Sequence, residues 1–245
     1  MINTNIIESE ELLDINFKSL LARAYSESGL PKKYHFATID NTWSTEYSST
    51  HKLSEGSQQK SLLVKKIINA YIQNIDNIIS GSPLQLNFPS RIQLVDNLIL
   101  DGGKDSGKTL LLSIIGQHAI NSGHSVKYLN WPEFIDLFHS FESRNTNSDL
   151  FNDLCKVEIL IFDNVFDYQA PLSQFFHLLL DRLIAARTSA GLITICAIDT
   201  INSSNPVFGS LWNSFTRESF TLHLPGHEYE TNTKRNRTSN YKKSN

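Results

Sequence analysis

The sequence predicts an α/β fold in which a central parallel β-sheet lies between two layers of helices. Apolar runs of strand length alternate with longer segments whose apolar residues recur every three or four positions. Several runs are apolar at consecutive positions, which is typical of parallel strands buried on both faces. With 245 residues, of which 40% are hydrophobic, the chain can form one large domain with a short appendage.

A glycine-rich loop stands at the centre of this pattern. An apolar run at 94–100, predicted to be a strand, precedes it, and a helix-compatible run at 110–115 follows it. A strand, a glycine-rich turn and a helix in this order form a P-loop, whose amides and helix N-terminus favour phosphate groups. We therefore expect a nucleotide to bind at this G-x-x-x-x-G-K-T motif and the residue behind it. These residues are Gly102, Gly103, Lys104, Asp105, Ser106, Gly107, Lys108, Thr109 and Leu110.

The residue types of the loop suggest separate roles in binding a nucleotide. Gly102 and Gly107 allow the backbone to approach the phosphates closely. The amine of Lys108 is expected to reach the β- and γ-phosphates, and the hydroxyl of Thr109 is expected to bind Mg²⁺. The predicted cofactors are therefore ATP and Mg²⁺.

A second feature points to the same site. The four consecutive apolar residues at 159–162 are followed by Asp163, about 55 residues after the loop. A buried parallel strand with this pattern brings a carboxylate to its C-terminal end, beside the P-loop, where it can hold Mg²⁺ through water. Asp163 is therefore a second candidate for the metal site, together with Thr109.

The remaining elements are predicted from apolar spacing and from the positions of Gly and Pro. Helices are expected at about 9–26, with Ser9 as the N-cap, and at 59–79, 131–143, 150–154, 172–189 and 210–217. Strands are expected at 125–129, 192–198 and 220–224, with a loop at 44–59 and a connector at 84–93. Arg187, near the end of its helix, is expected to interact with the helix dipole.

Composition narrows the class of protein. The formal net charge is −3, but residues 231–245 hold five basic residues and no acid, so the rest of the chain carries −8 (−3 minus 5). Residues outside the tail are therefore not expected to form a generic nucleic-acid binder. The tail has two possible roles: it attracts phosphates or an acidic partner, or it is a solvated, disordered end. The two cysteines, Cys155 and Cys196, indicate neither a disulfide framework nor a zinc site. In the absence of a run of 18 apolar residues, we expect a cytosolic protein with no membrane partner.

Several stretches together carry a resemblance to a known family. They are the segment 29–41, the loop 102–109 with the leucines behind it, the stretch 122–129, the strand 159–163 and the stretch 183–187 before the strand at 193–198. In these stretches the chain resembles the AAA+ helicase loaders of the DnaC/DnaI type and their relatives, the IstB-type transposition ATPases. The resemblance covers about residues 28–224.

The resemblance implies an AAA+ three-layer fold with a short N-terminal helical extension and little or no C-terminal lid domain. It divides the chain into a partner-docking helix at 1–28, an ATPase domain at 29–230 and a basic tail at 231–245. It also implies an ATPase that delivers a hexameric replicative helicase to DNA. In such a protein the N-terminal helix contacts the helicase, the ATPase core touches single-stranded DNA, and a homo-oligomer or a ring on the helicase can form.

Three positions depart from the pattern of the family. Asn164 stands where an acidic residue usually polarises the attacking water, and an amide can orient water but cannot take its proton. Asp199 stands where the sensor strand usually ends in Ser-Asn, so it is either a polar sensor or a strand-end cap. Arg217 is the candidate arginine finger, the alternative being a surface arginine. These departures suggest a protein that binds ATP but hydrolyses it slowly and uses it as a switch.

Two other functions remain open at this point. An IstB-type transposition regulator would assemble on duplex DNA with ATP and recruit a transposase. A degenerate AAA+ protein would cap or inhibit a helicase without needing Lys108. The helix at 9–26 correspondingly either packs on its own domain or docks on a partner.

Overall fold

The computed structural model describes residues 4–43, 55–89, 91–136, 148–165, 174–199, 215 and 219–225. Its centre is a parallel sheet of five strands in the order β4-β5-β6-β3-β7. These strands are β3 (Asn97–Asp101), β4 (Val126–Asn130), β5 (Ile159–Val165), β6 (Ile193–Ile198) and β7 (Ser219–His223). The predicted α/β class and the strands expected near 125, 159, 192 and 220 are confirmed.

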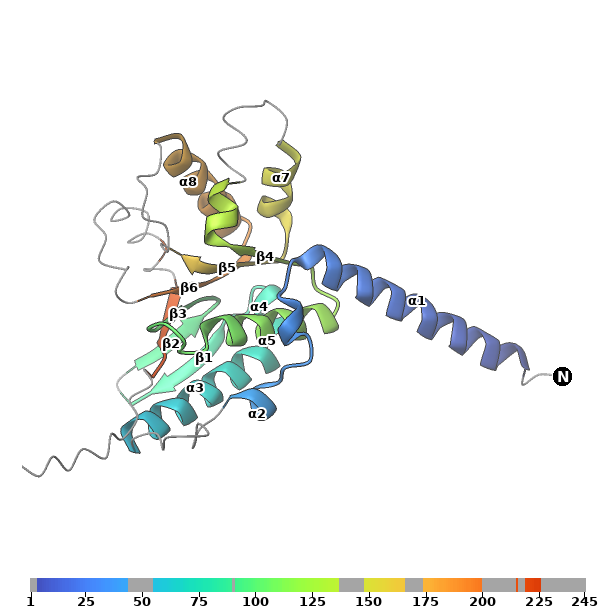
Figure 1. Cartoon of the computed structure of the whole chain (residues 1–245), viewed down its shortest axis with the longest axis horizontal. Coiled ribbons are helices and arrows are strands. Elements are labelled where there is room, and N and C mark those ends of the chain that lie inside the picture. Colours follow the sequence, from blue (N-terminus) through green and yellow to red (C-terminus); the bar gives the residue numbers. More distant parts are fainter. Residues whose placement is uncertain are drawn as a thin grey trace, which may run out of the picture.

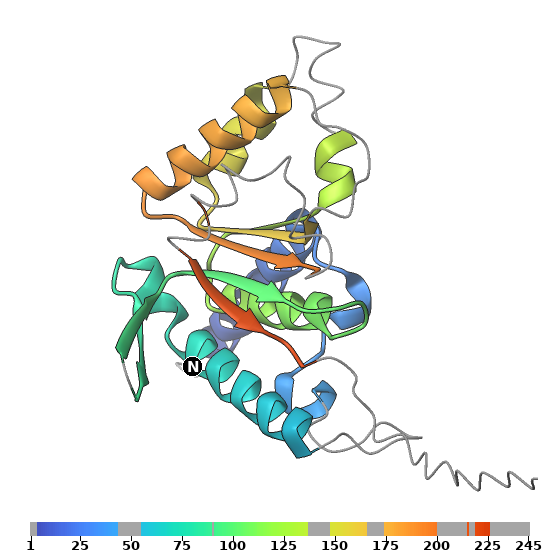
Figure 2. The ribbon, with the colours of Figure 1, turned by 90° about the vertical axis from the view of Figure 1, so that its left-hand side faces the viewer.

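Helices cover both faces of this sheet, as Figure 2 shows. On one face lie α1 (Thr4–Ser28), α3 (Glu55–Gln73) and α5 (Lys108–Asn121), and on the other lie helical residues 131–136, α7 (Ser148–Lys156) and α8 (Gln174–Ser189). Side chains alternate along each strand. Leu98 and Leu100 therefore join the core shared with α3 and α5, while Ile99 joins the core shared with α7 and α8.

One predicted strand is wrong in its extent. The run at 94–100 is split between β2 (Arg91–Val95), which pairs antiparallel with β1 (Leu84–Phe88), and β3. The split lies at Asp96, whose carboxylate accepts the N–H of Asn97 at 2.6 Å and whose carbonyl accepts the hydroxyl of Tyr71 at 2.6 Å. The predicted connector at 84–93 is therefore a hairpin, and Leu94 within it is 57% exposed.

Three helix boundaries also differ from the prediction. The helix α1 begins at Thr4 and not near Ser9, and α3 begins at Glu55, inside the predicted loop. The expected helix at 59–79 is divided into α3 and α4 (Ile75–Ile79) at Asn74, whose side-chain amide donates to the carbonyl of Ala70 at 2.8 Å. Asn74 thus stands between the two helices, and Asn side chains can compete with the backbone for hydrogen bonds at such positions.

Residues 29–43, which follow α1, lie close to α5. They contain the short helices η1 (Lys32–Tyr34) and α2 (Ile39–Thr42). A Cβ on Gly116, in the middle of α5, would lie 2.9 Å from Leu30, and a Cβ on Gly107, at the start of α5, would lie 2.6 Å from Trp43. Residues 29–43 therefore run along α5 from its middle to the glycine-rich loop, and we call them the strap.

Candidate functional site

The glycine-rich loop joins the end of β3 to the start of α5. Gly107 is the N-cap of α5 and has φ 88°, a conformation that L side chains rarely adopt. A Cβ on Gly102 would lie 2.6 Å from Oγ of Ser106, so this turn also has no space for a side chain. Gly107 offers no side-chain cap to the first amides of α5, and such amides are available to an anion.

The amine of Lys108 is held inside the loop. Lys108 is only 8% exposed, and its Nζ donates to the carbonyls of Gly102 at 2.5 Å and Gly103 at 2.7 Å. Burial lowers the pKa of this amine, while the nearby carboxylates of the site oppose the shift. Those carboxylates belong to Asp199, Asp163, Asp101 and Asp105. The loop thus places one buried amine among four acids, so a polyphosphate entering here meets negative charge that a metal ion would offset.

Asp163 lies at the centre of a hydrogen-bond cluster at the end of β5. The residue is 1% exposed, and its Oδ2 accepts the hydroxyl of Thr109 at 2.6 Å. The same oxygen accepts the hydroxyl of Tyr128 at 2.5 Å, and Oδ1 accepts the N–H of Asn164 at 2.9 Å. Burial raises the pKa of Tyr128, and the charge of Asp163 raises it further, so its phenol is a donor. The two residues proposed from sequence for the metal, Thr109 and Asp163, are therefore in direct contact.

A cavity of about 540 Å³ opens beside this cluster. Most of the predicted site residues line it, and its remaining lining residues are Lys33, Tyr34 and Val165. The predicted members are Lys104, Asp105, Ser106, Gly107, Lys108, Thr109, Leu110, Asn164 and Asp199. Gly102 and Gly103 reach the site through the carbonyls that hold Lys108. The candidate Arg217 lies outside the described residues.

Asn164 and Asp199 line the same cavity but come from other parts of the sequence than the loop. Asn164 has φ 54°, a left-handed conformation that Asn tolerates better than most residues, and its side-chain amide donates to Asn130 at 3.3 Å. Asp199 directly follows β6. The two residues therefore come from the C-terminal ends of the neighbouring strands β5 and β6, of which β6 pairs with β3.

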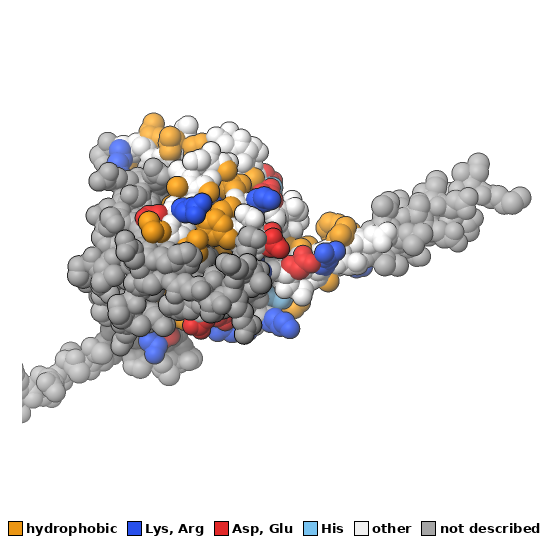
Figure 3. Space-filling model, turned by 90° about the horizontal axis from the view of Figure 1, so that it is seen from above, with side chains coloured by type: hydrophobic (Ala, Val, Ile, Leu, Met, Phe, Trp, Pro, Cys, Tyr) orange, Lys and Arg blue, Asp and Glu red, His pale blue; other side chains and the backbone are white. Residues whose placement is uncertain are grey.

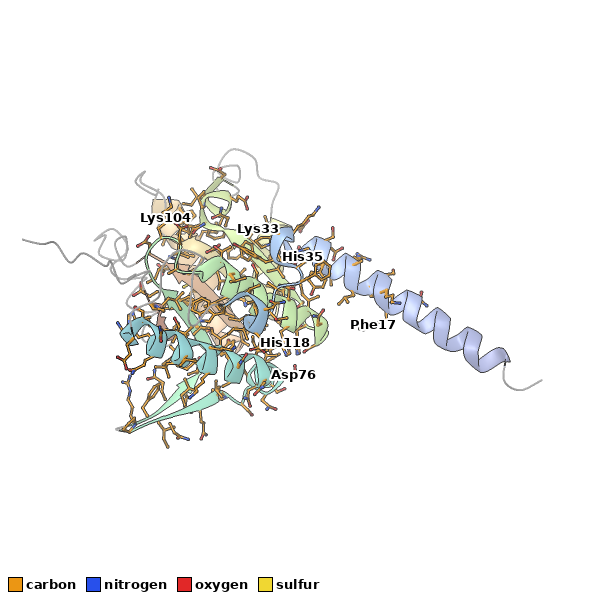
Figure 4. The ribbon with its side chains drawn as sticks, turned by 60° about the horizontal axis from the view of Figure 1, so that its bottom comes forward. Phe17, Lys33, His35, Asp76, Lys104 and His118 are labelled. Atoms are coloured by element: carbon orange, nitrogen blue, oxygen red, sulfur yellow. The ribbon has the colours of Figure 1, made fainter. Side chains whose placement is uncertain are left out.

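Sequence reasoning missed the contribution of the strap. Lys33 and Tyr34 of η1 line the cavity, and the carbonyl of Tyr34 accepts the side-chain amide of Gln117 on α5 at 2.5 Å. Figure 4 labels Lys33 together with Lys104 of the loop, which lines the same cavity. The family resemblance includes the segment 29–41 but gives none of its side chains a role in the site. Tyr128 was missed because its strand pattern indicated only a buried position.

The residues present fit a nucleotide phosphate chain and a magnesium ion. Oγ of Ser106, in the loop, is buried and has no partner among the described atoms, so it is a polar group without the hydrogen bond that buried polar groups require. Thr109 and Asp163 supply the oxygen ligands that Mg²⁺ prefers. Within the residues that the structure describes, no three His, Cys, Asp or Glu side chains form a group that could hold a metal ion.

Comparisons with known proteins agree with this geometry. The family model of the IstB-like ATP-binding protein matches residues 84–212. A curated relative, the chromosomal replication initiator protein DnaA of Aliarcobacter butzleri, is 26% identical over 151 residues, which are 57% of this chain and 34% of DnaA. This chain therefore spans about a third of that relative.

Solved structures share the fold. The DnaC helicase loader has a TM-score of 0.52 at 14% identity, covering 77% of this chain and 99% of DnaC. AMPPCP-bound DnaA from Aquifex aeolicus has a TM-score of 0.55 at 16% identity, covering 80% of this chain and 51% of DnaA. At such identities these likenesses show the fold alone, which is the AAA+ fold that the sequence resemblance implied.

Within the part of the chain that the structure describes, no helix is both long and apolar enough to cross a membrane. The glycine-rich loop and the carboxylate of β5 meet at one edge of the five-stranded sheet. Because the family model covers more than half of its length, the chain belongs to the IstB-like ATP-binding proteins.

Proposed function

We propose that this protein is an ATP- and magnesium-binding helicase loader. It binds ATP between the glycine-rich loop and β5, docks through α1 on a hexameric replicative helicase, and helps to deliver that helicase to single-stranded DNA. The observation that carries the nucleotide part is the contact of Thr109 with Asp163 at the mouth of the loop that holds Lys108. The DnaC helicase loader, which shares the fold over nearly its whole length, supports the choice of function.

In this proposal two side chains of the loop, those of Lys108 and Ser106, gain the ligand as a partner. Lys108 leaves the carbonyls of Gly102 and Gly103 for the phosphates, and the hydroxyl of Ser106 gains a partner. Thr109 and Asp163 hold Mg²⁺, which would neutralise phosphate charge when bound. Lys33 and Tyr34 lie where the remainder of the nucleotide would extend beyond the loop.

Hydrolysis is proposed to be slow. Asn164 lines the cavity next to Asp163 and can orient a water molecule, but its amide cannot accept the proton of that water. Asp199 is proposed to sense the bound nucleotide, and Arg217 to act as an arginine finger toward a neighbouring copy. The protein would thus use ATP mainly as a switch between two conformations.

The docking surface is proposed to be the part of α1 that extends beyond the body (Figure 1). Near the body, Leu21, Ala24 and Tyr25 pack on the core. Further out, Phe17 is 58% exposed and Leu20 is 65% exposed, so the apolar stripe continues where nothing described covers it. Figure 3 shows apolar and basic side chains side by side on this part of the helix. Residues 1–28 would thus form the docking element, 29–230 the ATPase domain and 231–245 the basic tail.

Pull-down with the purified replicative helicase of the same cell tests the docking surface. The double variant Phe17→Ser/Leu20→Ser should lose helicase binding and keep ATP binding. Leu62→Ser/Leu63→Ser is the matched control, because these leucines of α3 are 47% and 50% exposed but lie on another helix. Helicase binding that survives the change at Phe17 and Leu20, and survives deletion of residues 1–26, would refute the docking assignment.

The family match favours a second function, that of a transposition regulator. Such a protein would assemble on duplex DNA in an ATP-dependent way and recruit a transposase. Electron microscopy with duplex DNA distinguishes the two: ATP-dependent filaments or rings on duplex DNA, together with no helicase binding, would favour the regulator. A helicase inhibitor, in turn, predicts that Lys108→Ala leaves partner binding unchanged.

A further inference from the structure

We propose that Tyr128 is a positioning residue of the magnesium site, whose hydroxyl holds the Asp163 carboxylate against Thr109 and so sets the affinity of the site for Mg²⁺. This inference rests on the proposed function, because it concerns the residues that would hold the ion. It assigns a role to a side chain of β4, a strand that the nucleotide motifs do not include.

The hydroxyl of Tyr128 is placed for this role by the pairing of two strands. In the parallel register of β4 and β5, Tyr128 lies opposite Ile161, and Asn130 lies opposite Asp163. Tyr128 thus sits two residues before the level of Asp163, and its side chain is long enough to reach Oδ2 at 2.5 Å. At the level of Asp163 itself, Asn130 accepts the side-chain amide of Asn164. The end of β4 therefore supports both residues at the end of β5.

The backbone of Tyr128 is also held in place by the strap. A Cβ on Gly29 would lie 2.8 Å from the carbonyl oxygen of Tyr128, so the strap lies directly on β4 at this residue and has no space for a side chain. Tyr128 is 8% exposed, and its ring belongs to the core shared with α3 and α5. A group that orients a metal ligand acts well only when its own position is fixed, and this ring is fixed on several sides.

The hydroxyls of Thr109 and Tyr128 have different roles at Asp163. Both donate to Oδ2, at 2.6 Å and 2.5 Å. In the proposed function Thr109 turns to the metal, which leaves Tyr128 as the side-chain donor to this oxygen among the residues that the structure describes. Tyr128 would then prevent the carboxylate from rotating away from the metal. Hydrogen-bond partners that orient a metal ligand in this way typically change metal affinity about ten- to hundredfold when they are removed.

The test is nucleotide binding by the full-length protein as a function of Mg²⁺ concentration, followed with a fluorescent ATP analogue. Tyr128→Phe keeps the ring and removes the hydroxyl. It should raise the Mg²⁺ concentration needed for half-maximal binding about tenfold or more, and leave binding in EDTA unchanged. In the Asp163→Asn background, Tyr128→Phe should cause no further change, because it acts through that carboxylate.

Tyr71→Phe is the matched control. It removes the phenol hydroxyl of another buried tyrosine, which donates to the carbonyl of Asp96 at 2.6 Å, and Tyr71 is not among the residues that line the cavity. Thermal unfolding without nucleotide compares the stability of the two variants. Nucleotide binding by Tyr71→Phe should depend on Mg²⁺ as it does in the wild type.

Two other outcomes would count against the positioning role. If Tyr128→Phe has the Mg²⁺ dependence of the wild type, or if it weakens binding in EDTA as much as in Mg²⁺, the positioning role is refuted while the proposed function stands. If the wild type itself shows no Mg²⁺-dependent binding, the magnesium site and this role fall together.

Discussion

The contact between Gly107 and Trp43 allows the geometry of the loop to be tested by substitution. Gly107→Ala introduces a Cβ at a residue with φ 88° and 2.6 Å from Cζ3 of Trp43. The left-handed backbone alone costs about 1–2 kcal/mol for a residue with a Cβ. Overpacking against a buried ring adds about 1–3 kcal/mol. Trp43 cannot move freely, because it is 9% exposed and its Nε1 donates to the carbonyl of Ser61 at 3.3 Å.

Two other glycines separate these contributions. Gly123 has φ 91° with open space around it, so Gly123→Ala measures the backbone strain alone. Gly103 has neither a positive φ nor a neighbour within 4 Å of its Cβ position, so Gly103→Ala should change stability little. The expected order of destabilisation is Gly107→Ala, then Gly123→Ala, then Gly103→Ala.

Urea unfolding of the three variants without nucleotide measures these differences as shifts of the midpoint. Thermal unfolding should show the same order, at about 2–4 °C per kcal/mol for a chain of this size. Gly107→Ala should also weaken ATP binding, since the loop must shift to accept the methyl group. If Gly107→Ala destabilises the protein no more than Gly123→Ala does, the strap does not lie against the loop as described.

Three further predictions concern other parts of the molecule. The pKa of His124 is raised, since hydrogen bonds to Asp76 and Glu158 outweigh the effect of burial. This histidine therefore contributes stability that is complete below about pH 6.5, its ordinary pKa, and that is lost as pH rises through its higher folded pKa. Above about pH 6.5 the urea midpoint of His124→Gln should fall less with rising pH than the midpoint of the wild type. An equal dependence of the two midpoints on pH would refute this. Arg187→Met should destabilise the fold by about 3 kcal/mol or more, because several buried carbonyls lose their hydrogen-bond donor and each costs about 1–3 kcal/mol when left unpaired. The control Arg182→Met, on the exposed side of α8, should change the urea midpoint little. Lys108→Ala should abolish nucleotide binding in a filter-binding assay while leaving the circular dichroism spectrum unchanged, and retained binding would exclude the loop as the phosphate site.

Much of the fold and of the site could be predicted from the sequence because its signals are local. The glycines of the loop motif allow the backbone conformation that the loop requires. The apolar run that ends at Asp163 predicts a strand buried on both faces. Parallel strands bring their C-terminal ends to one edge, so the contact of Thr109 with Asp163 followed from two separate motifs.

The features that the sequence did not reveal depend on contacts between distant segments. Arg187 looked like a residue of a helix end, yet it is fully buried and donates to carbonyls of four residues and to Thr194. Its role depends on how α8 packs on β5 and β6, which no local pattern records. The hairpin was missed for a different reason: the apolar run across Asp96 was read as one strand, although a turn at that residue divides it.

Isothermal titration of ATP into the wild type and Asp163→Asn, each with Mg²⁺ and with EDTA, tests the central claim most directly. The account predicts that the wild type binds ATP more tightly with Mg²⁺ than with EDTA, and that Asp163→Asn loses most of this difference while it still folds. Equal affinity of the wild type under both conditions, or an unchanged Mg²⁺ effect in Asp163→Asn, would contradict a nucleotide and metal site between the loop and β5.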